Sequence, residues 1–167
     1  MKKWFLIFVL SCSNLIFAAL PSVKEVRNLY EKAALESNSC TKIITLLDTY
    51  NEKNNALLAG YKACATMMMA NYVINPYSKL SNFKEGKMLL EKCIKADNDN
   101  IELRFLRFSV QSKAPSFLGY HTSINSDKTF LINSIPSLND SDLKQRIISF
   151  LKNSEHFTAT EKLKLTN

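Results

Sequence analysis

The chain has 167 residues, which is enough for one domain or for one domain and a leader. Hydrophobic residues make up 46% of it, and there are only 3 glycines and 4 prolines, which argues against a loop-rich all-β fold or a disordered tail. The net charge is +7, but the lysines are interleaved with acidic residues and form no basic run, so no nucleic-acid partner is expected.

The first residues have the pattern of a secretory signal peptide. Lys2 and Lys3 supply the positive start, and two apolar runs follow, at Trp4–Leu10 and Leu15–Ala19. We expect a signal peptide over residues 1–18, cleaved before Ala19, and an exported protein that is periplasmic or secreted. The polar residues between the two runs make a membrane-spanning helix a poor alternative, so no integral membrane segment is expected after cleavage.

A lipid anchor is the alternative for this N-terminus. Val9–Cys12 loosely resembles a bacterial lipobox, in which Cys12 would be lipidated. Lipoproteins normally continue into a polar tether, whereas the sequence after Cys12 is apolar. Residues 19–167 are expected to form a single α-helical domain in either case.

Helix start signals recur through the first half of this domain. Ser22 and Glu25 form a capping box for the first helix, which Ser37–Ser39 interrupts. A second helix is indicated by apolar residues at helical spacing, namely Ile43, Leu46, Leu47 and Tyr50. The polar connection at residues 51–55 is short, so the second and third helices should be antiparallel neighbours.

The third helix is expected over Ala56–Ile74 and is nearly free of charge. Its Met67–Met69 triplet could suggest a metal site or a binding groove, but consecutive residues point in three directions, so core packing is favoured. Asn75-Pro76 should end this helix, because a residue before proline disfavours helical geometry. Asn82, with Glu85 three residues later, is expected to cap the fourth helix.

Asp99–Gln111 is expected to form a fifth helix that is apolar on almost every side. Its apolar residues are Ile101, Leu103, Phe105, Leu106, Phe108 and Val110. Such a helix belongs in the interior, yet Arg104 and Arg107 lie on one face of it, with Gln111 one turn further along. Buried arginines need acidic partners or a ligand.

The C-terminal part is expected to be helical as well. The apolar loop Ser116–Ser126 should fold back onto the core, and a short helix should follow over Asp127–Ile135. Asp140 should start the next helix, and Thr158 with Glu161 forms a capping box for a tail helix. The fold class is therefore all-α, with about seven helices after the signal peptide.

One fragment resembles a known helical repeat. In Phe83–Asn100, FKEGKMLLEKCIKADNDN, Gly86 and Cys93 occupy small-residue positions and Leu90 a large apolar one, as in the second helix of a tetratricopeptide (TPR) repeat. NALLAGYKA, at residues 55–63, resembles a first helix of such a repeat. The resemblance implies a short array of antiparallel helical hairpins, an α-solenoid. A compact irregular helical domain is the alternative. The leader with this helical arrangement is also similar to uncharacterised exported bacterial proteins, which implies no activity.

The cysteines do not have metal-ligand spacing. The domain holds Cys40, Cys64 and Cys93, an odd number without a CxxC motif. Cys64 and Cys93 fall at similar heights if the third and fourth helices are antiparallel, and an exported protein permits a disulfide between them. Both residues also suit positions where helices pack closely, so the bridge and simple packing both remain open.

No recognised catalytic motif is present. HExxH, GxSxG, the P-loop and GxGxxG are all absent, so no catalytic residue, cofactor or metal is predicted and the protein is not expected to be an enzyme. One alternative is an enzyme of unrecognised type that uses His121 near Tyr120 and Asp127. A purely structural envelope protein is another.

The remaining candidate binding residues lie on and beside the arginine helix: Arg104, Arg107, Gln111, Tyr120 and His121. The first helices of TPR-like units line a concave groove, so these side chains could hold a carboxylate or the backbone of a peptide. An exported protein or peptide interaction module is thus the expected function. The competing interpretation is that the arginines hold the fold together by pairing with acidic residues, namely Glu85, Glu91, Glu102 or Asp127.

Overall fold

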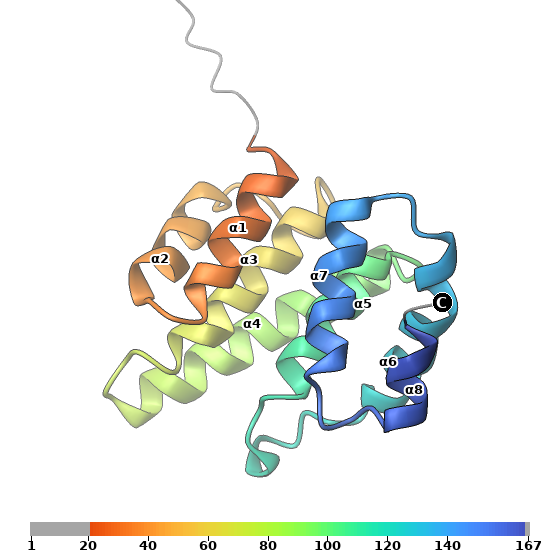
Figure 1. Cartoon of the computed structure of the whole chain (residues 1–167). Coiled ribbons are helices and arrows are strands. Elements are labelled where there is room, and N and C mark those ends of the chain that lie inside the picture. The colour runs from red at the N-terminus through yellow and green to blue at the C-terminus, as the bar shows by residue number, and fades with distance from the viewer. Residues whose placement is uncertain (1–20, 166–167) are drawn as a thin grey trace, which may run out of the picture.

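The computed structural model describes residues 21–165, and this part of the chain is all α-helical without strands (Figure 1). Its eight α-helices are α1 (Val23–Ala33), α2 (Ser37–Leu46), α3 (Ala56–Met69), α4 (Pro76–Ala96), α5 (Ile101–Gln111), α6 (Ile124–Ser134), α7 (Ser141–Lys152) and α8 (Ala159–Lys164). Two 3-10 turns, η1 (Ser116–Leu118) and η2 (Ile135–Ser137), lie between them. The predicted all-α fold class is confirmed.

The expected signal peptide and the alternative lipid anchor at Cys12 fall outside the described residues. Within residues 21–165, no helix combines the length and the apolar character needed to cross a membrane.

Several helix starts form as their local sequence predicts. The Ser22 hydroxyl accepts a hydrogen bond from the Glu25 amide at 3.2 Å, and the Glu25 carboxylate accepts one from the Ser22 amide, which completes the capping box of α1. Thr158 and Glu161 do the same for α8. The Asp140 carboxylate accepts from the Leu143 amide at 3.0 Å and caps α7.

The start of α4 differs from the prediction. Asn75-Pro76 does not merely end the preceding helix, which stops at Met69; it begins α4, and Asn82 lies inside that helix. The Asn75 side chain accepts from the amides of Tyr77 and Ser78. Pro76 is compatible with the first helical position because its missing N–H would have had no helical partner there.

Three other expected starts are corrected. Ser37–Ser39 does not interrupt the chain but forms the first turn of α2. Asn100, not Asp99, caps α5, with its side-chain oxygen 3.1 Å from the amides of Glu102 and Leu103. Helix α6 begins at Ile124 and so includes Asp127 in its first turn.

Helices that follow one another in the chain pack together. Contacts form between α1 and α2, α2 and α3, α3 and α4, and α5 and α6, while α1 also packs on α3, α3 on α5, and α5 on α7 (Figure 1). Helices α3 and α4 approach each other closely at Gly86, where an added Cβ would collide with the carbonyl oxygen of Ala63 and the amide nitrogen of Met67. Gly86 therefore sets the spacing of this hairpin.

The apolar interior consists of two clusters that share α5. The first fills the space among α1, α2, α3 and α4 and includes Leu103 and Leu106 of α5. The second joins α6, α7 and the C-terminal residues to Phe105 and Phe108 from the other side of α5. An α-helix that touches neighbours on both sides must be apolar around most of its circumference, as α5 is.

Candidate functional site

Arg107 lies at the centre of the predicted site and is fully engaged by acidic residues. Its Nε and Nη2 donate to Asp127 of α6 at 2.7 and 2.8 Å, and its Nη1 donates to Glu91 of α4 at 2.9 Å. The Asp127 carboxylate is completely buried, and the Arg107 side chain is 9% exposed. This arginine consequently ties α4, α5 and α6 together.

Arg104 shares the Asp127 carboxylate with Arg107. Its Nε donates to Asp127 Oδ1, and its Nη1 lies 3.1 Å from the side-chain oxygen of Asn98. The guanidinium also stacks over the ring of Phe130 at 4.6 Å from the ring centroid. A carboxylate that accepts from two arginines is well compensated for its burial.

Tyr120 joins the same network through Glu91. The Tyr120 hydroxyl donates to Glu91 Oε1 at 2.6 Å, and burial together with the Glu91 carboxylate raises the pKa of Tyr120 well above its usual value. Its ring packs edge-on against Phe83 at 5.9 Å, and Lys87 Nζ lies 4.8 Å from the ring centroid. These contacts anchor the loop after α5 to α4.

Gln111 and His121 do not join this network through hydrogen bonds. Gln111 is completely buried, and neither its amide nitrogen nor its amide oxygen has a hydrogen-bond partner among the described residues. His121 Nε2 lies 2.9 Å from the carbonyl oxygen of Ala114. The arrangement of His121 with Tyr120 and Asp127 considered for an enzyme is not assembled, because each side chain contacts a different group.

The predicted site thus consists of three parts rather than one. Arg104, Arg107 and Tyr120 are linked through Glu91 and Asp127, while Gln111 and His121 stand apart. The competing interpretation, in which the arginines pair with acidic residues, holds for Glu91 and Asp127. A ligand-binding role for the five residues stays a prediction.

A second buried arginine cluster was not predicted. Arg27 of α1 donates to both carboxylate oxygens of Glu102 in α5, at 2.7 and 2.8 Å, and to Asp140 and Asp142 at the start of α7 at 2.8 and 3.1 Å. The Tyr61 hydroxyl donates to the same Glu102. Its position on the apolar stripe of the first helix could have indicated that Arg27 is buried. Its acidic partners could not be predicted, because they lie at least 75 residues away along the chain.

The cysteines are packing residues with unreactive thiols. Cys40, Cys64 and Cys93 are buried and free, so the disulfide considered between Cys64 and Cys93 is not formed. Burial raises the pKa of all three thiols, that of Cys93 to about 12. Since the thiolate is the nucleophile, these side chains are poorly suited to covalent chemistry. Within residues 21–165, no group of three or more histidine, cysteine or acidic side chains could hold a metal ion.

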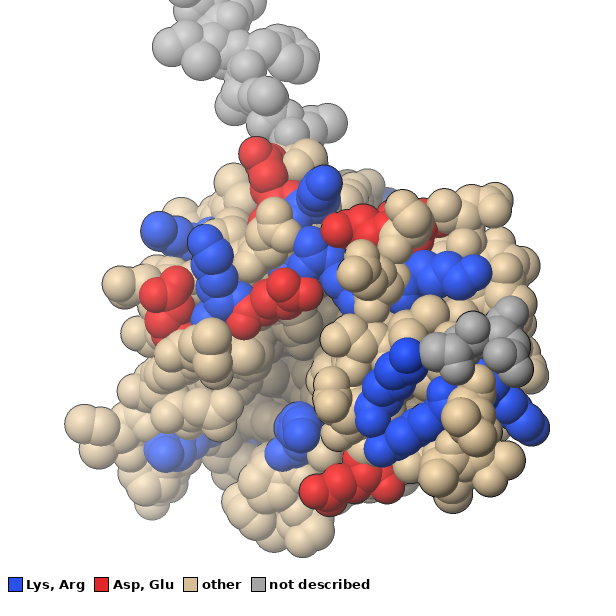
Figure 2. Space-filling model, in the orientation of Figure 1, with Lys and Arg blue, Asp and Glu red and all other residues tan. Residues whose placement is uncertain are grey.

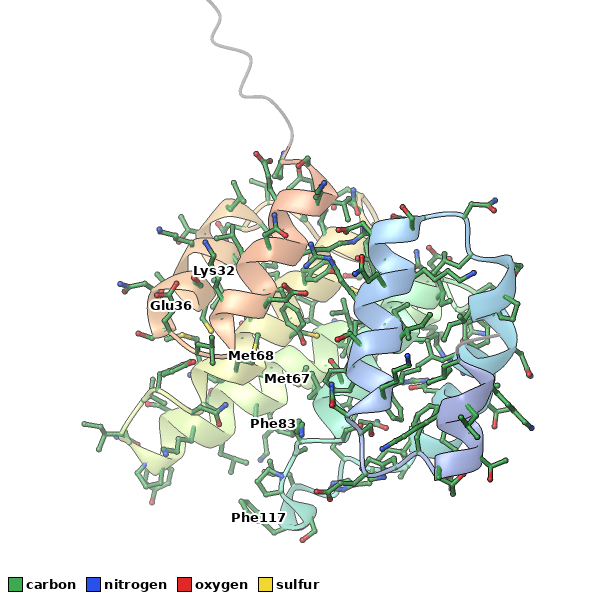
Figure 3. The ribbon with its side chains drawn as sticks, viewed as in Figure 1. Lys32, Glu36, Met67, Met68, Phe83 and Phe117 are labelled. Atoms are coloured by element: carbon green, nitrogen blue, oxygen red, sulfur yellow. The ribbon has the colours of Figure 1, made fainter. Side chains whose placement is uncertain are left out.

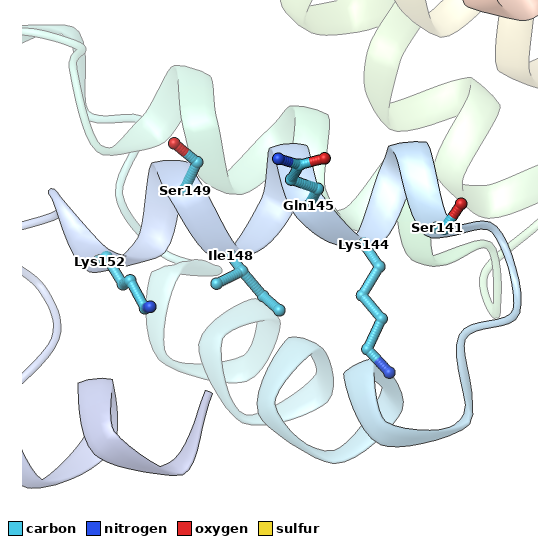
Figure 4. Close-up of a pocket in the computed structure, with 6 residues that line it drawn as sticks. All are labelled: Ser141, Lys144, Gln145, Ile148, Ser149 and Lys152. Carbon is cyan, nitrogen blue, oxygen red and sulfur yellow. The ribbon is translucent and has the colours of Figure 1, made fainter. Parts of the chain in front are cut away.

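A shallow hollow lies on the surface of α7. All residues that line it come from one face of that helix: Ser141, Lys144, Gln145, Ile148, Ser149 and Lys152 (Figure 4). Side chains from a single helix cannot surround a small molecule, as a ligand pocket normally does.

A recess lies between the two halves of the molecule. Figure 2 shows the recess between the lobe that contains α1 to α4 and the lobe that contains α7 and α8. Four labelled side chains follow one line down this side of the ribbon: Met67, Met68, Phe83 and Phe117 (Figure 3). We call these four residues the apolar face. Met67 and Phe83 are buried, Met68 is half-buried and Phe117 is 84% exposed.

Comparison with known proteins gives no relative. No family model, no curated protein and no solved structure matches this chain.

Proposed function

We propose that this protein is a non-enzymatic, exported interaction module that holds a polypeptide segment of a partner along the apolar face. Helices arranged as consecutive hairpins, as in the TPR-like arrays that the sequence resembles, are suited to such binding because they present side chains from several helices on one side. The charged groups of the arginine helix are engaged internally. An apolar surface is therefore the better binding determinant than a salt bridge to a ligand.

The exposure of Phe117 is the observation that carries this proposal. The apolar loop was expected to fold back onto the core, and Tyr120 does so, but Phe117 points away from it. The turn that presents Phe117 is fixed by Gly119, whose φ of 59° favours glycine, and by the Tyr120 contacts to Glu91 and Phe83. A large aromatic side chain that is held outside on a fixed turn is typical of an interface anchor.

Met68 is half-buried and adds adaptability to this surface, whereas Met67 is buried in the core beside it. Met67 packs against Gly86 of α4, one turn from Phe83, so the buried part of the apolar face is continuous between α3 and α4. Met68, beside it, is partly accessible. Methionine side chains adapt to partners of different shape and are common on binding surfaces for apolar peptide segments.

The test is site-specific photo-crosslinking in cells that produce the full chain. A photoreactive phenylalanine analogue is placed at position 117 in one variant and at position 88 in another. Met88 is the matched control, because it is an exposed apolar residue on the other side of α4, where it lines a hollow with α2 and α3. We expect one discrete protein adduct from position 117 and none from position 88.

The adduct then supplies a quantitative test. The crosslinked segment of the partner is identified by mass spectrometry and titrated as a peptide. Phe117→Ser should weaken its binding by roughly thirtyfold or more, the effect of losing an interface hot spot of about 2 kcal/mol. Met88→Ser should leave it unchanged. Equal adducts from both positions, or equal affinity of both variants, would contradict the proposal.

A further inference from the structure

The connection between α3 and α4 forms an exposed apolar tip. All residues from Ile74 to Ser81 are exposed, which includes the first turn and a half of α4. Ile74 is 93% and Tyr77 86% exposed, and Leu80 follows one turn later on α4. We call Ile74, Tyr77, Leu80 and the two nearby lysines, Lys79 and Lys84, the α3–α4 tip. Three large apolar side chains this close together are unusual on a free surface.

The charged residues from Lys53 to Lys84 are all lysines, and the exposed Glu85 follows directly after them. No aspartate or glutamate occurs from Lys53 to Lys84. Lys79 and Lys84 are both exposed. The tip therefore combines apolar side chains with cationic ones, a pattern that suits an anionic partner.

The neighbouring α1–α2 turn extends the same end of the molecule. The Tyr72 hydroxyl donates to the carbonyl oxygen of Ala33 at 2.9 Å, which joins this turn to the α3–α4 connection. Leu35 on the turn is largely exposed. Its one acidic residue, Glu36, accepts a hydrogen bond from the hydroxyl of Ser39 at 2.5 Å. Glu36 is thus turned toward its own helix.

The shape of the tip favours a lipid surface, rather than a peptide or a helix, as its partner. In Figure 1 the α3–α4 connection projects at the lower left, beyond α1 and α2. The lower-left projection in Figure 2 is tan with a blue side chain and no red on the visible face. A convex tip cannot enclose a peptide or a helix, but its side chains can enter the boundary between lipid headgroups and acyl chains.

We propose that the α3–α4 tip docks the protein peripherally on an anionic lipid bilayer. Ile74 and Leu80 insert at the boundary between headgroups and acyl chains, and Tyr77 lies at headgroup level, where tyrosine is enriched in membrane proteins. Lys79 and Lys84 interact with lipid phosphates. This proposal is independent of the apolar face, since none of its residues belongs to that surface.

The test is co-sedimentation of the full chain, as its producing cell processes it, with vesicles of equimolar phosphatidylglycerol and phosphatidylcholine. Vesicles of phosphatidylcholine alone are the neutral comparison. We expect binding to the anionic vesicles that is much weaker on the neutral ones. The variant Ile74→Ser, Tyr77→Ser, Leu80→Ser should lose binding by more than tenfold, because it removes the inserted apolar area. Replacing Lys79 or Lys84 by glutamine should cost about fivefold for each lysine on the anionic vesicles only.

A matched control variant also replaces three exposed apolar residues by serine, but outside the α3–α4 tip. The variant Leu46→Ser, Met88→Ser, Leu163→Ser replaces three such residues, none of them in the tip or the apolar face, and it should bind as the unmodified protein does. Because all variants have the same N-terminus, any contribution of residues 1–20 is common to them. Equal sedimentation of the two triple variants overturns the proposal. So does a lipid-free dimer that the tip variant abolishes while vesicle binding is unchanged, which would make the tip a self-association surface.

Discussion

Asp127 compensates two arginines at once, so the stability of the arginine helix depends on its charge. Asp127→Asn keeps the shape of the side chain but leaves Arg104 and Arg107 largely buried without their shared carboxylate. Removing one partner of a buried ion pair costs about 3–5 kcal/mol, and we expect that loss in the free energy of unfolding measured with urea. The exposed Asp99→Asn is the control and should change it by less than about 0.5 kcal/mol. A loss below about 1 kcal/mol at Asp127 would show that the network contributes little.

Gln111 is the opposite case, a buried polar side chain without partners among the described residues. A buried amide that makes no hydrogen bond costs about 1–3 kcal/mol, so Gln111→Met, which keeps a similar shape, should raise the free energy of unfolding by about 1–2 kcal/mol. Thermal or urea unfolding measures the change. Destabilisation instead would indicate that a bound water or ligand satisfies the amide of Gln111 in solution.

At the residue scale, the sequence predicts that the arginines of α5 need acidic partners, but it does not predict every acidic partner correctly. Two arginines on an apolar helix imply acidic neighbours, and Glu91 and Asp127 lie close enough in sequence to be considered. Arg27 and Glu102 belong to helices far apart in the chain, and only the packing of α1 on α3 and of α3 on α5 brings them together. From the sequence, Glu102 is a candidate partner of Arg104 or Arg107, whereas in the structure it pairs with Arg27 and Tyr61.

Among the helix contacts, the one between α3 and α4 at Gly86 leaves no room for an added methyl group. In Gly86→Ala the new methyl group would collide with the backbone of α3, at Ala63 and Met67, which cannot yield without separating the helices. We expect a loss of about 1–3 kcal/mol in the free energy of unfolding, the usual cost of overpacking. Chemical denaturation of the purified variant measures it.

Gly60→Ala is the matched comparison, since Gly60 also lies at a helix contact. Its new methyl group would meet the end of the Leu103 side chain, which can change its rotamer. Alanine favours the helix by about 1 kcal/mol over glycine at both positions, so the difference comes from the collision, and Gly60→Ala should be clearly less destabilised than Gly86→Ala. The reverse order would mean that Leu103, rather than the α3 backbone, limits the packing.

At the element scale, local chemistry explains which helix boundaries could be predicted. Capping boxes and Asp140 act within a few residues, so they identify the starts of α1, α7 and α8. Asn75-Pro76 is ambiguous because proline is compatible both with the end of one helix and with the first position of the next. For Phe117 no local pattern distinguishes an apolar side chain that packs inward from one held outside.

For the whole molecule, acid should weaken the contact between α1 and α7. The pKa of Asp140 is lowered by the Leu143 amide and by Arg27, and that of Asp142 by Arg146 and Arg27. The Lys128 ammonium lowers the pKa of Glu161 in α8 to about 2. A carboxylate with a lowered pKa in the folded state stabilises it above its unfolded pKa, near 3.8 for aspartate, and loses that effect as the pH falls through the folded value.

The urea midpoint should therefore be steady from about pH 7 to pH 5 and fall below about pH 4. Asp142→Asn should make that fall less steep, because one of the protons taken up on acid unfolding is removed. A midpoint that is insensitive to pH in this range, or a variant as steep as the unmodified protein, would contradict the role assigned to these carboxylates.

The N-terminus gives a prediction that concerns the processed chain. Intact mass of the protein recovered from its cell envelope or medium should correspond to a chain that begins at Ala19. A mass that corresponds to a chain starting at Cys12 with added acyl groups would support the lipid anchor instead. The unprocessed mass would contradict both.

Because α5 contributes to both apolar clusters, the chain cannot be divided at this helix into two fragments that each keep a complete core. A fragment that ends before α5 would expose the surfaces of α3 and α4 that Leu103 and Leu106 cover, and a fragment that begins after α5 would lack Phe105 and Phe108. A fragment that keeps α5 on either side would leave the opposite apolar face of that helix in water. Neither half is therefore suited to fold as a separate domain.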